Sequence, residues 1–85
     1  MQCSIYKSKK KHDLYLYVIR KDDFSDVPEA LYKSLGEPVF VMALELTPER
    51  KLAREDAVRV IRRLEDKGFF VQLPPNKMSS PRLLQ

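Results

Sequence analysis

Two stretches near the start of the chain alternate apolar and polar side chains with the period of two that is typical of β-strands. The first covers residues 3–6 and the second residues 14–19, and a polar loop rich in lysine separates them. This arrangement predicts a β-hairpin. In its second strand the alternation divides the side chains between the two faces of the sheet: Leu14, Leu16 and Val18 against Tyr15, Tyr17 and Ile19.

The residues after the hairpin change to a pattern typical of a helix start. Asp26 is placed to cap the helix, Pro28 is tolerated in a first turn, and Glu29 lies three residues after Asp26, as in a capping box. Ser25 is the competing cap. Apolar side chains then recur at helical spacing until Gly36, which predicts a short first helix.

The second half of the chain repeats the order of strand, helix and strand. Residues 39–46 are apolar at nearly every position, which predicts the most buried strand of the sheet. A second helix with one apolar stripe is expected to begin near Ala53 or Arg54 and to end at Gly68. Residues 69–73 form the last predicted strand, which Pro74 and Pro75 terminate.

The element order ββαβαβ predicts an α+β fold, a two-layer α/β sandwich in which two helices cover one face of a small mixed or antiparallel sheet. With 85 residues, the chain is long enough for one domain. We expect that domain to cover residues 1–75, and the polar, proline-interrupted residues 76–85 to form a disordered tail.

Charge and cysteine content indicate the setting of the protein. Residues 1–12 carry four lysines and no acidic residue, residues 13–46 carry a net charge of −4, and residues 47–67 carry +2. Two basic regions therefore bracket an acidic middle, which permits an anionic partner without requiring one. The single cysteine excludes an intrachain disulfide, and no apolar run is long enough to span a bilayer, so we expect a cytoplasmic protein that does not bind a membrane.

The chain resembles the YcgL domain family of small bacterial proteins. The matching stretches are residues 3–8, 15–18, 22–25 with 27–29, Gly36 with Pro38, 51–53 with Asp56, and 68–75. The resemblance implies a small α/β fold in a bacterial cytosolic setting. It implies no activity, because the family is functionally uncharacterised, and no catalytic or binding residue is transferred from it.

Candidate catalytic chemistry is sparse. One cysteine and one histidine, Cys3 and His12, are too few for a zinc site, and the hairpin is expected to hold them at opposite ends. The chain has no glycine-rich phosphate loop, so we expect no metal and no cofactor. Asp22 and Asp23 are the remaining acidic candidates, although their expected role is to shape the turn before the first helix.

The hairpin also carries a candidate binding surface of tyrosines beside lysines: Tyr6, Lys7, Lys9, Lys10, Lys11, Tyr15 and Tyr17. If the helices cover the aliphatic face, the tyrosines share the open face, as in platforms that stack single-stranded nucleic acid. The alternative is that the tyrosines cover a sheet face and the lysines protect the hairpin from aggregation. A contact patch for a protein is a third possibility.

A second basic surface is predicted on the outer face of the second helix, where Arg59, Arg62, Arg63 and Lys67 lie. Glu55 lies four residues before Arg59 and Asp66 four residues after Arg62, the spacing of ion pairs along a helix, which favours an ordinary solvent face. The leading hypothesis is a non-catalytic protein-binding or adaptor module that uses the open sheet face or the Pro-Pro tail. A nucleic-acid-associated module is the alternative, and an enzyme using Asp22 and Asp23 ranks third. The sequence does not indicate the partner's identity, the oligomeric state or the strand order.

Overall fold

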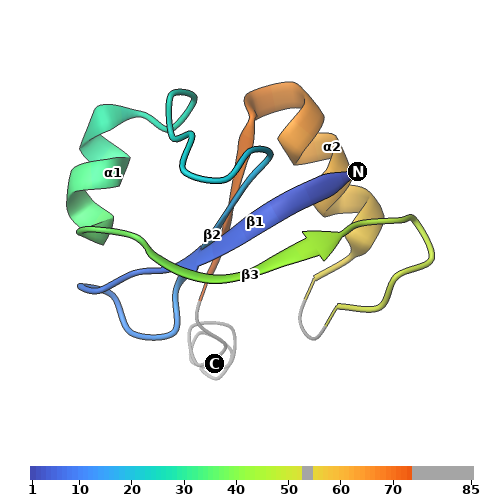
Figure 1. Ribbon diagram of the computed structural model, residues 1–85, viewed down its shortest axis with the longest axis horizontal. Helices are drawn as coiled ribbons and strands as arrows, with labels where there is room; N and C mark the ends of the chain where they lie inside the picture. Colours follow the sequence, from blue (N-terminus) through green and yellow to red (C-terminus); the bar gives the residue numbers. More distant parts are fainter. Residues whose placement is uncertain (53–54, 74–85) are drawn as a thin grey trace, which may run out of the picture.

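A computed structural model of the 85-residue chain describes residues 1–52 and 55–73. The two predicted tail features, Pro74-Pro75 and residues 76–85, therefore lie outside the described residues. The described elements follow the predicted order and are shown in Figure 1: β1 (Gln2–Lys7), β2 (Tyr15–Val18), α1 (Glu29–Leu35), β3 (Val39–Glu45), α2 (Ala57–Lys67) and β4 (Phe69–Gln72).

The four strands form one antiparallel sheet in the order β3-β1-β2-β4. The predicted hairpin is confirmed, with Lys7 opposite Tyr15 and Ser4 opposite Val18. The chain from β2 through α1 returns β3 to the far side of β1, and α2 returns β4 to the outer side of β2. The α+β class is confirmed, and β3 and β4 form the two edges of the sheet.

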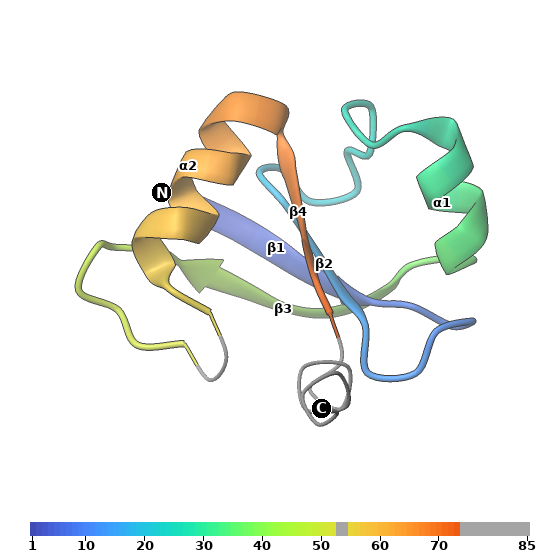
Figure 2. The same cartoon turned by 180° about the vertical axis from the view of Figure 1, so that it is seen from behind.

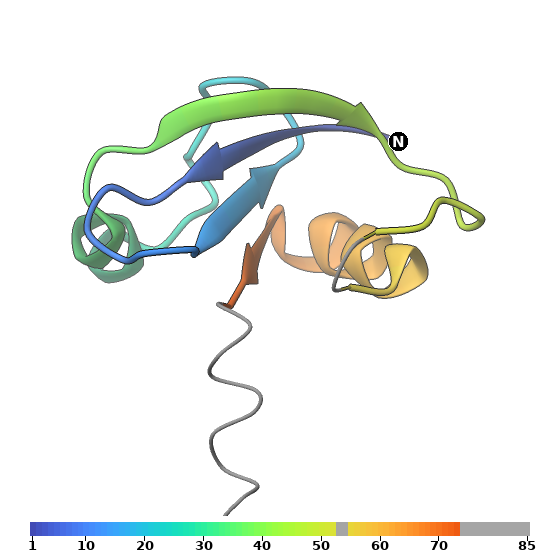
Figure 3. The same cartoon turned by 90° about the horizontal axis from the view of Figure 1, so that it is seen from below.

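The helices lie on opposite faces of this sheet, so the prediction of two layers with both helices on one face was wrong (Figures 1 and 3). On one face α2 covers a core that contains Ile5 and Tyr17. On the other face the segment from residue 20 through α1 covers a core that contains Tyr6 and Leu16. The central strands are buried on both faces, and the alternating tyrosines of the hairpin are core residues of two different clusters.

The prediction that residues 39–46 form the most buried strand was also wrong. β3 is an edge strand, and its side chains Phe40, Val41 and Met42 are 41%, 45% and 43% exposed. A register shift interrupts its pairing with β1, between Ile5 and Tyr6. A continuous apolar run fits a buried strand and an apolar edge equally well, and the position of the strand in the sheet decides between them.

Both helices begin later than the capping patterns predict. α1 begins at Glu29 after Pro28, without a side-chain cap, so neither Asp26 nor Ser25 caps it. α2 begins at Ala57, where Asp56 accepts a hydrogen bond of 3.2 Å from the Val58 amide, rather than near residue 53 or 54. The predicted ends are confirmed, because Gly36 and Gly68 directly follow the two helices.

Candidate functional site

The tyrosines do not form the shared open face that the sequence predicts. Tyr6 is 2% exposed and Tyr17 is 4% exposed, and they lie in the cores of opposite faces. Tyr15 is half-buried beside the core on the α2 face. A stacking platform requires accessible aromatic rings on one surface, and the fold removes two of the three proposed rings from solvent.

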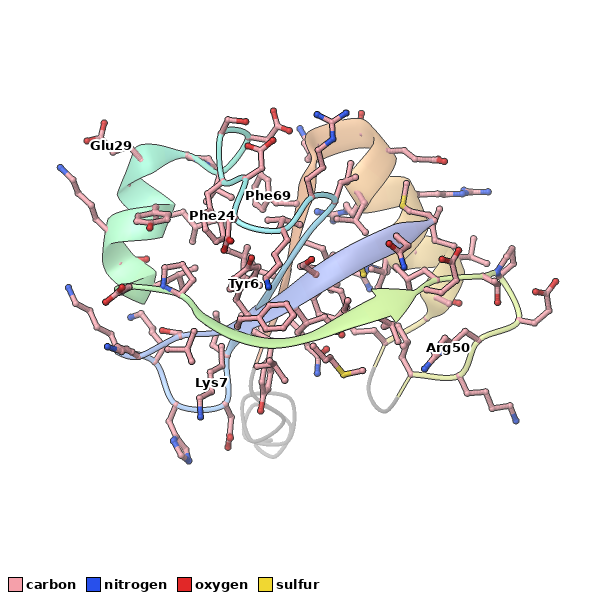
Figure 4. The ribbon with its side chains drawn as sticks, viewed as in Figure 1. Tyr6, Lys7, Phe24, Glu29, Arg50 and Phe69 are labelled. Carbon is pink, nitrogen blue, oxygen red and sulfur yellow. The ribbon has the colours of Figure 1, made fainter. Side chains whose placement is uncertain are left out.

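Tyr6 and Asp22 hold the loop before α1 onto the sheet. The Tyr6 hydroxyl donates to Asp22 Oδ1 at 3.0 Å and accepts from the Asp22 amide at 2.6 Å. Burial raises the pKa of the Tyr6 phenol, and the Asp22 carboxylate beside it acts in the same direction. The ring also makes an edge contact with Phe24, with ring centroids 4.9 Å apart (Figure 4). These contacts give Asp22 a structural role.

Asp23 has its own local partner, so the two neighbouring aspartates do not converge on one point. The hydroxyl and the amide of Ser25 donate to Asp23 Oδ1 at 2.6 Å and 3.1 Å. These hydrogen bonds lower the pKa of Asp23, which is exposed and ionised at neutral pH. The arrangement offers no general acid at this position, because such a group needs a raised pKa.

The lysine loop is bound to the end of α1. The Ser8 hydroxyl donates to the Leu35 carbonyl at 2.6 Å and accepts from the amides of Lys10 and Lys11. Lys10 Nζ reaches the Lys33 carbonyl at 3.3 Å, and Lys9 forms an exposed ion pair of 3.5 Å with Glu37. Lys7 points away from the sheet into solvent (Figure 4).

Four of the proposed surface residues do lie together. Tyr15, Lys7, Lys9 and Lys10 line a depression of about 410 Å³ around the hairpin loop. Tyr6 and Tyr17 are not part of its lining. Whether this smaller surface binds a partner stays a prediction.

Cys3 and His12 are held apart, as the sequence predicts. Cys3 lies in β1, 1% exposed, opposite Leu44, whereas His12 is exposed in the hairpin loop. Burial raises the pKa of the Cys3 thiol to about 11. The thiolate is the nucleophilic form of cysteine, so a buried thiol with this pKa is unreactive at neutral pH. In residues 1–52 and 55–73, no three His, Cys, Asp or Glu side chains are grouped to hold a metal ion.

Because the pKa of Cys3 is raised in the folded chain, the free energy of unfolding is expected to decrease at alkaline pH. In the unfolded chain the thiol loses its proton near its ordinary pKa of 9.0, whereas in the folded chain it keeps the proton up to about 11. The contribution is fully present below pH 9 and is lost as the pH rises through this window. We expect the free energy of unfolding to fall by about 1 kcal/mol more between about pH 8 and pH 10 than in the Cys3→Ala variant, as measured by urea unfolding. Equal slopes for the two proteins would contradict this prediction.

A concave surface surrounds the outer edge of β4, the edge that faces away from β2. A groove of about 620 Å³ runs along this strand between α2 and the segment before α1, and Figure 2 shows β4 and α2 side by side from this side of the molecule. Its lining combines a basic helix face with the apolar side chains of a strand: Asp26, Pro28, Glu55, Arg59, Arg63, Lys67, Phe69, Phe70, Val71 and Leu73. Within residues 1–52 and 55–73, β4 pairs with β2 and with no other strand, in a regular register without a shift.

The basic side chains of this groove are not neutralised by the ion pairs that the sequence predicts. In the described part of the chain, Arg59, Arg63 and Lys67 have no carboxylate within ion-pair distance. The expected ion pair of Glu55 with Arg59 is therefore wrong, and among the described residues Asp66 forms no ion pair with Arg62 either. The bases recur every four residues, and this spacing is the sequence signal for a basic row along one helix face. The same spacing also fits ion pairs with nearby acidic residues, so the unpaired row was not predicted.

The strand order 3-1-2-4, the helix on each face and the grooved edge define a small antiparallel α+β domain. The sequence-family model of the YcgL domain matches residues 3–75 of this chain. The chain is 52% identical over 73 residues to a YcgL domain-containing protein of Pseudomonas putida, and the aligned region covers 86% of this chain and 75% of that protein. It is 46% identical over 79 residues to a YcgL domain-containing protein of Mannheimia succiniciproducens, and the aligned region covers 93% of this chain and 78% of that protein. The chain belongs to the YcgL domain family.

Family membership confirms the resemblance of the sequence and adds no activity, because the names of these relatives state none. Among the described residues, no helix has the length and apolar character to cross a membrane.

Proposed function

We propose that this protein is a non-catalytic protein-binding module that receives an extended segment of a partner along the free edge of β4. The edge of a sheet presents unpaired amide and carbonyl groups, which template the addition of another strand. The groove of about 620 Å³ beside that edge is the observation that carries the proposal. Domains that bind peptides by strand addition use the same elements, a sheet edge for the main chain and adjacent walls for the side chains.

The other edge of the sheet is less suited to this role. The register shift in β3 opposite Ile5 and Tyr6 disturbs the regular row of hydrogen-bonding groups. Lys21 also lies over the ring of Phe40, with Nζ 4.4 Å from the ring centroid, and so places a charge on this edge. Bulges and charges are devices by which natural proteins prevent an edge strand from pairing. β4 carries no register shift in its pairing with β2.

The sheet face and the Pro-Pro tail, which the sequence suggests as binding surfaces, support a binding role less well than the groove. Both faces of the sheet are covered, by α2 and by the segment through α1, so the central strands have no open face. Pro74 and Pro75 lie outside the described residues. The groove along β4 is the surface of the described chain that combines a strand edge with side-chain walls.

A synthetic peptide library tests strand addition. The peptides have about eight residues, a common strand length, with a β-branched residue at every second position. The tightest binder is then made in two forms, with N-methyl groups on one or the other set of alternate amides. Because an added strand uses one of its two edges, one form should lose binding and the other should keep it. The absence of any binder, or equal loss in both forms, would overturn the proposal.

A further inference from the structure

We infer that the segment bound along β4 alternates acidic and apolar residues, with about three acidic side chains at every second position. This inference rests on the proposed function and specifies the partner of the same groove. It follows from the chemistry of the two walls that flank the strand edge, which differ from each other. Successive side chains of an added strand point to opposite faces, so each wall selects one half of the partner's residues.

The wall formed by α2 is basic. Arg59, Arg63 and Lys67 all line the groove, and in the part of the chain that the structure describes none has an acidic partner. Residues four apart on a helix are separated by about 6 Å along its axis, and residues two apart on a strand by about 6.7 Å. Carboxylates at every second position of an extended segment can therefore meet successive bases of α2.

The opposite wall is apolar. Phe69 and Val71 belong to the cluster on the α1 face and are half-buried, which leaves part of each side chain available in the groove. Leu73 is 52% exposed, and Pro28 completes this lining from the segment before α1. Apolar residues of the partner, at the positions between the acidic ones, would cover this surface and remove it from water.

Two acidic residues of the groove limit the length of the acidic stretch. Glu55 precedes the first turn of α2, and Asp26 lies beside Gly68, directly after its last turn. The basic row is therefore flanked by a negative charge at each end. A partner with further carboxylates beyond about three positions would bring like charges together, which disfavours longer acidic runs.

A nucleic acid would supply a longer polyanion, and the groove is less suited to it. Phosphates meet the bases of α2, but a nucleotide chain offers no amide and carbonyl groups to the edge of β4. The half-buried apolar side chains Phe69 and Val71 would also stay uncovered, and the flanking acids would repel the continuing backbone.

Four labelled synthetic peptides of about eight residues test the inference with the full chain. One alternates Glu and Val, one alternates Lys and Val, one alternates Ser and Val, and one has the composition of the first in two blocks. We expect the alternating Glu-Val peptide to bind at least about tenfold more tightly than each of the others at low salt. Equal binding of the Ser-Val or block peptide would overturn the inference, and so would displacement of the Glu-Val peptide by a single-stranded oligonucleotide at equal concentration.

A matched pair of variants locates the interaction. Arg63→Glu reverses a charge in the groove, whereas Arg62→Glu reverses the neighbouring charge, which does not line the groove. Arg62 lines a second depression along α2, to which Arg59 and Arg63 also contribute. We expect Arg63→Glu to weaken binding of the Glu-Val peptide by about tenfold and to improve binding of the Lys-Val peptide, with less than about a twofold change for Arg62→Glu. Equal effects of the two variants would overturn the assignment to this groove.

The outcomes separate this inference from the proposed function. If the Ser-Val peptide binds as well as the Glu-Val peptide and keeps the asymmetric response to N-methylation, strand addition stands and the acidic partner is wrong. If no alternating peptide of any charge binds, both are wrong.

Discussion

Replacing Leu64 with alanine is expected to lower the free energy of unfolding by about 2 to 5 kcal/mol. Leu64 is 0% exposed and lies in the cluster that joins α2 to the sheet, with Val60, Tyr17 and Phe70. The substitution removes buried methyl groups and leaves a cavity that the surrounding side chains fill only in part. Because small domains are stable by about 5 to 15 kcal/mol, a large fraction of the protein's stability depends on this contact.

Urea unfolding followed by circular dichroism measures the effect of Leu64→Ala. The matched control is Leu73→Ala, in which the same side chain is removed from a position that is 52% exposed, and we expect a change below about 0.5 kcal/mol there. A cost below about 1 kcal/mol for Leu64→Ala would mean that α2 does not pack on the sheet as described. The basic wall of the groove would then lose its support, since α2 carries it.

Replacing Gly68 with alanine is expected to cost about 1 to 3 kcal/mol, although this residue is in a connection. Gly68 ends α2 with φ of +88°, in the left-handed region that side chains disfavour, and its amide donates to the Leu64 carbonyl at 2.9 Å. A Cβ atom at this position would also collide with the carboxylate of Asp26. The turn from α2 into β4 therefore requires glycine for two separate reasons.

A double-mutant cycle separates these two costs. In the background of Asp26→Gly the whole side chain is absent, including the Cβ atom that would also lie too close, so Gly68→Ala should retain the backbone cost of about 1 to 2 kcal/mol and lose the steric part. Thermal unfolding of the four proteins gives the coupling energy between the two sites. A Gly68→Ala variant as stable as the original chain would contradict the turn geometry on which the position of β4 depends.

The local structure was largely predictable because short-range chemistry determines it. The period of two in residues 14–19 gave the hairpin, and Gly36 and Gly68 gave the ends of both helices. The prediction that Asp26 caps the first helix was wrong because this residue packs against Gly68 instead. A contact between segments so distant in the sequence leaves no local signal.

The arrangement of the sheet was not predictable from the same patterns. Tyr6 and Tyr17 each carry an apolar ring and a polar hydroxyl, and both kinds of environment suit them until the strand order is known. In the structure Tyr6 bonds to Asp22, and the Tyr17 hydroxyl donates to the buried Gln72 at 2.7 Å. The two hydrogen bonds connect residues that are 16 and 55 positions apart in the sequence. Both tyrosine hydroxyls therefore find their partners through tertiary contacts, which the local sequence pattern does not predict.

One part of the candidate groove, its row of basic side chains on α2, was predictable from the sequence. The bases at residues 59, 63 and 67 are spaced along one helix face, but helical spacing also predicts ion pairs of Glu55 with Arg59 and of Asp66 with Arg62. The other part is the outer edge of β4, which pairs with no strand in the part of the chain that the structure describes. Strand order joins the two parts into one site.

Amide hydrogen exchange of the full chain, measured with and without the alternating Glu-Val peptide, tests most directly whether a partner adds to the edge of β4. We expect alternate amides of Phe69–Gln72, those on the outer edge of the strand, to become protected when the peptide is bound, while exchange in β3 stays unchanged. Protection of the amides of Val39–Glu45 in place of those of β4, or binding without protection of either edge, would contradict the account.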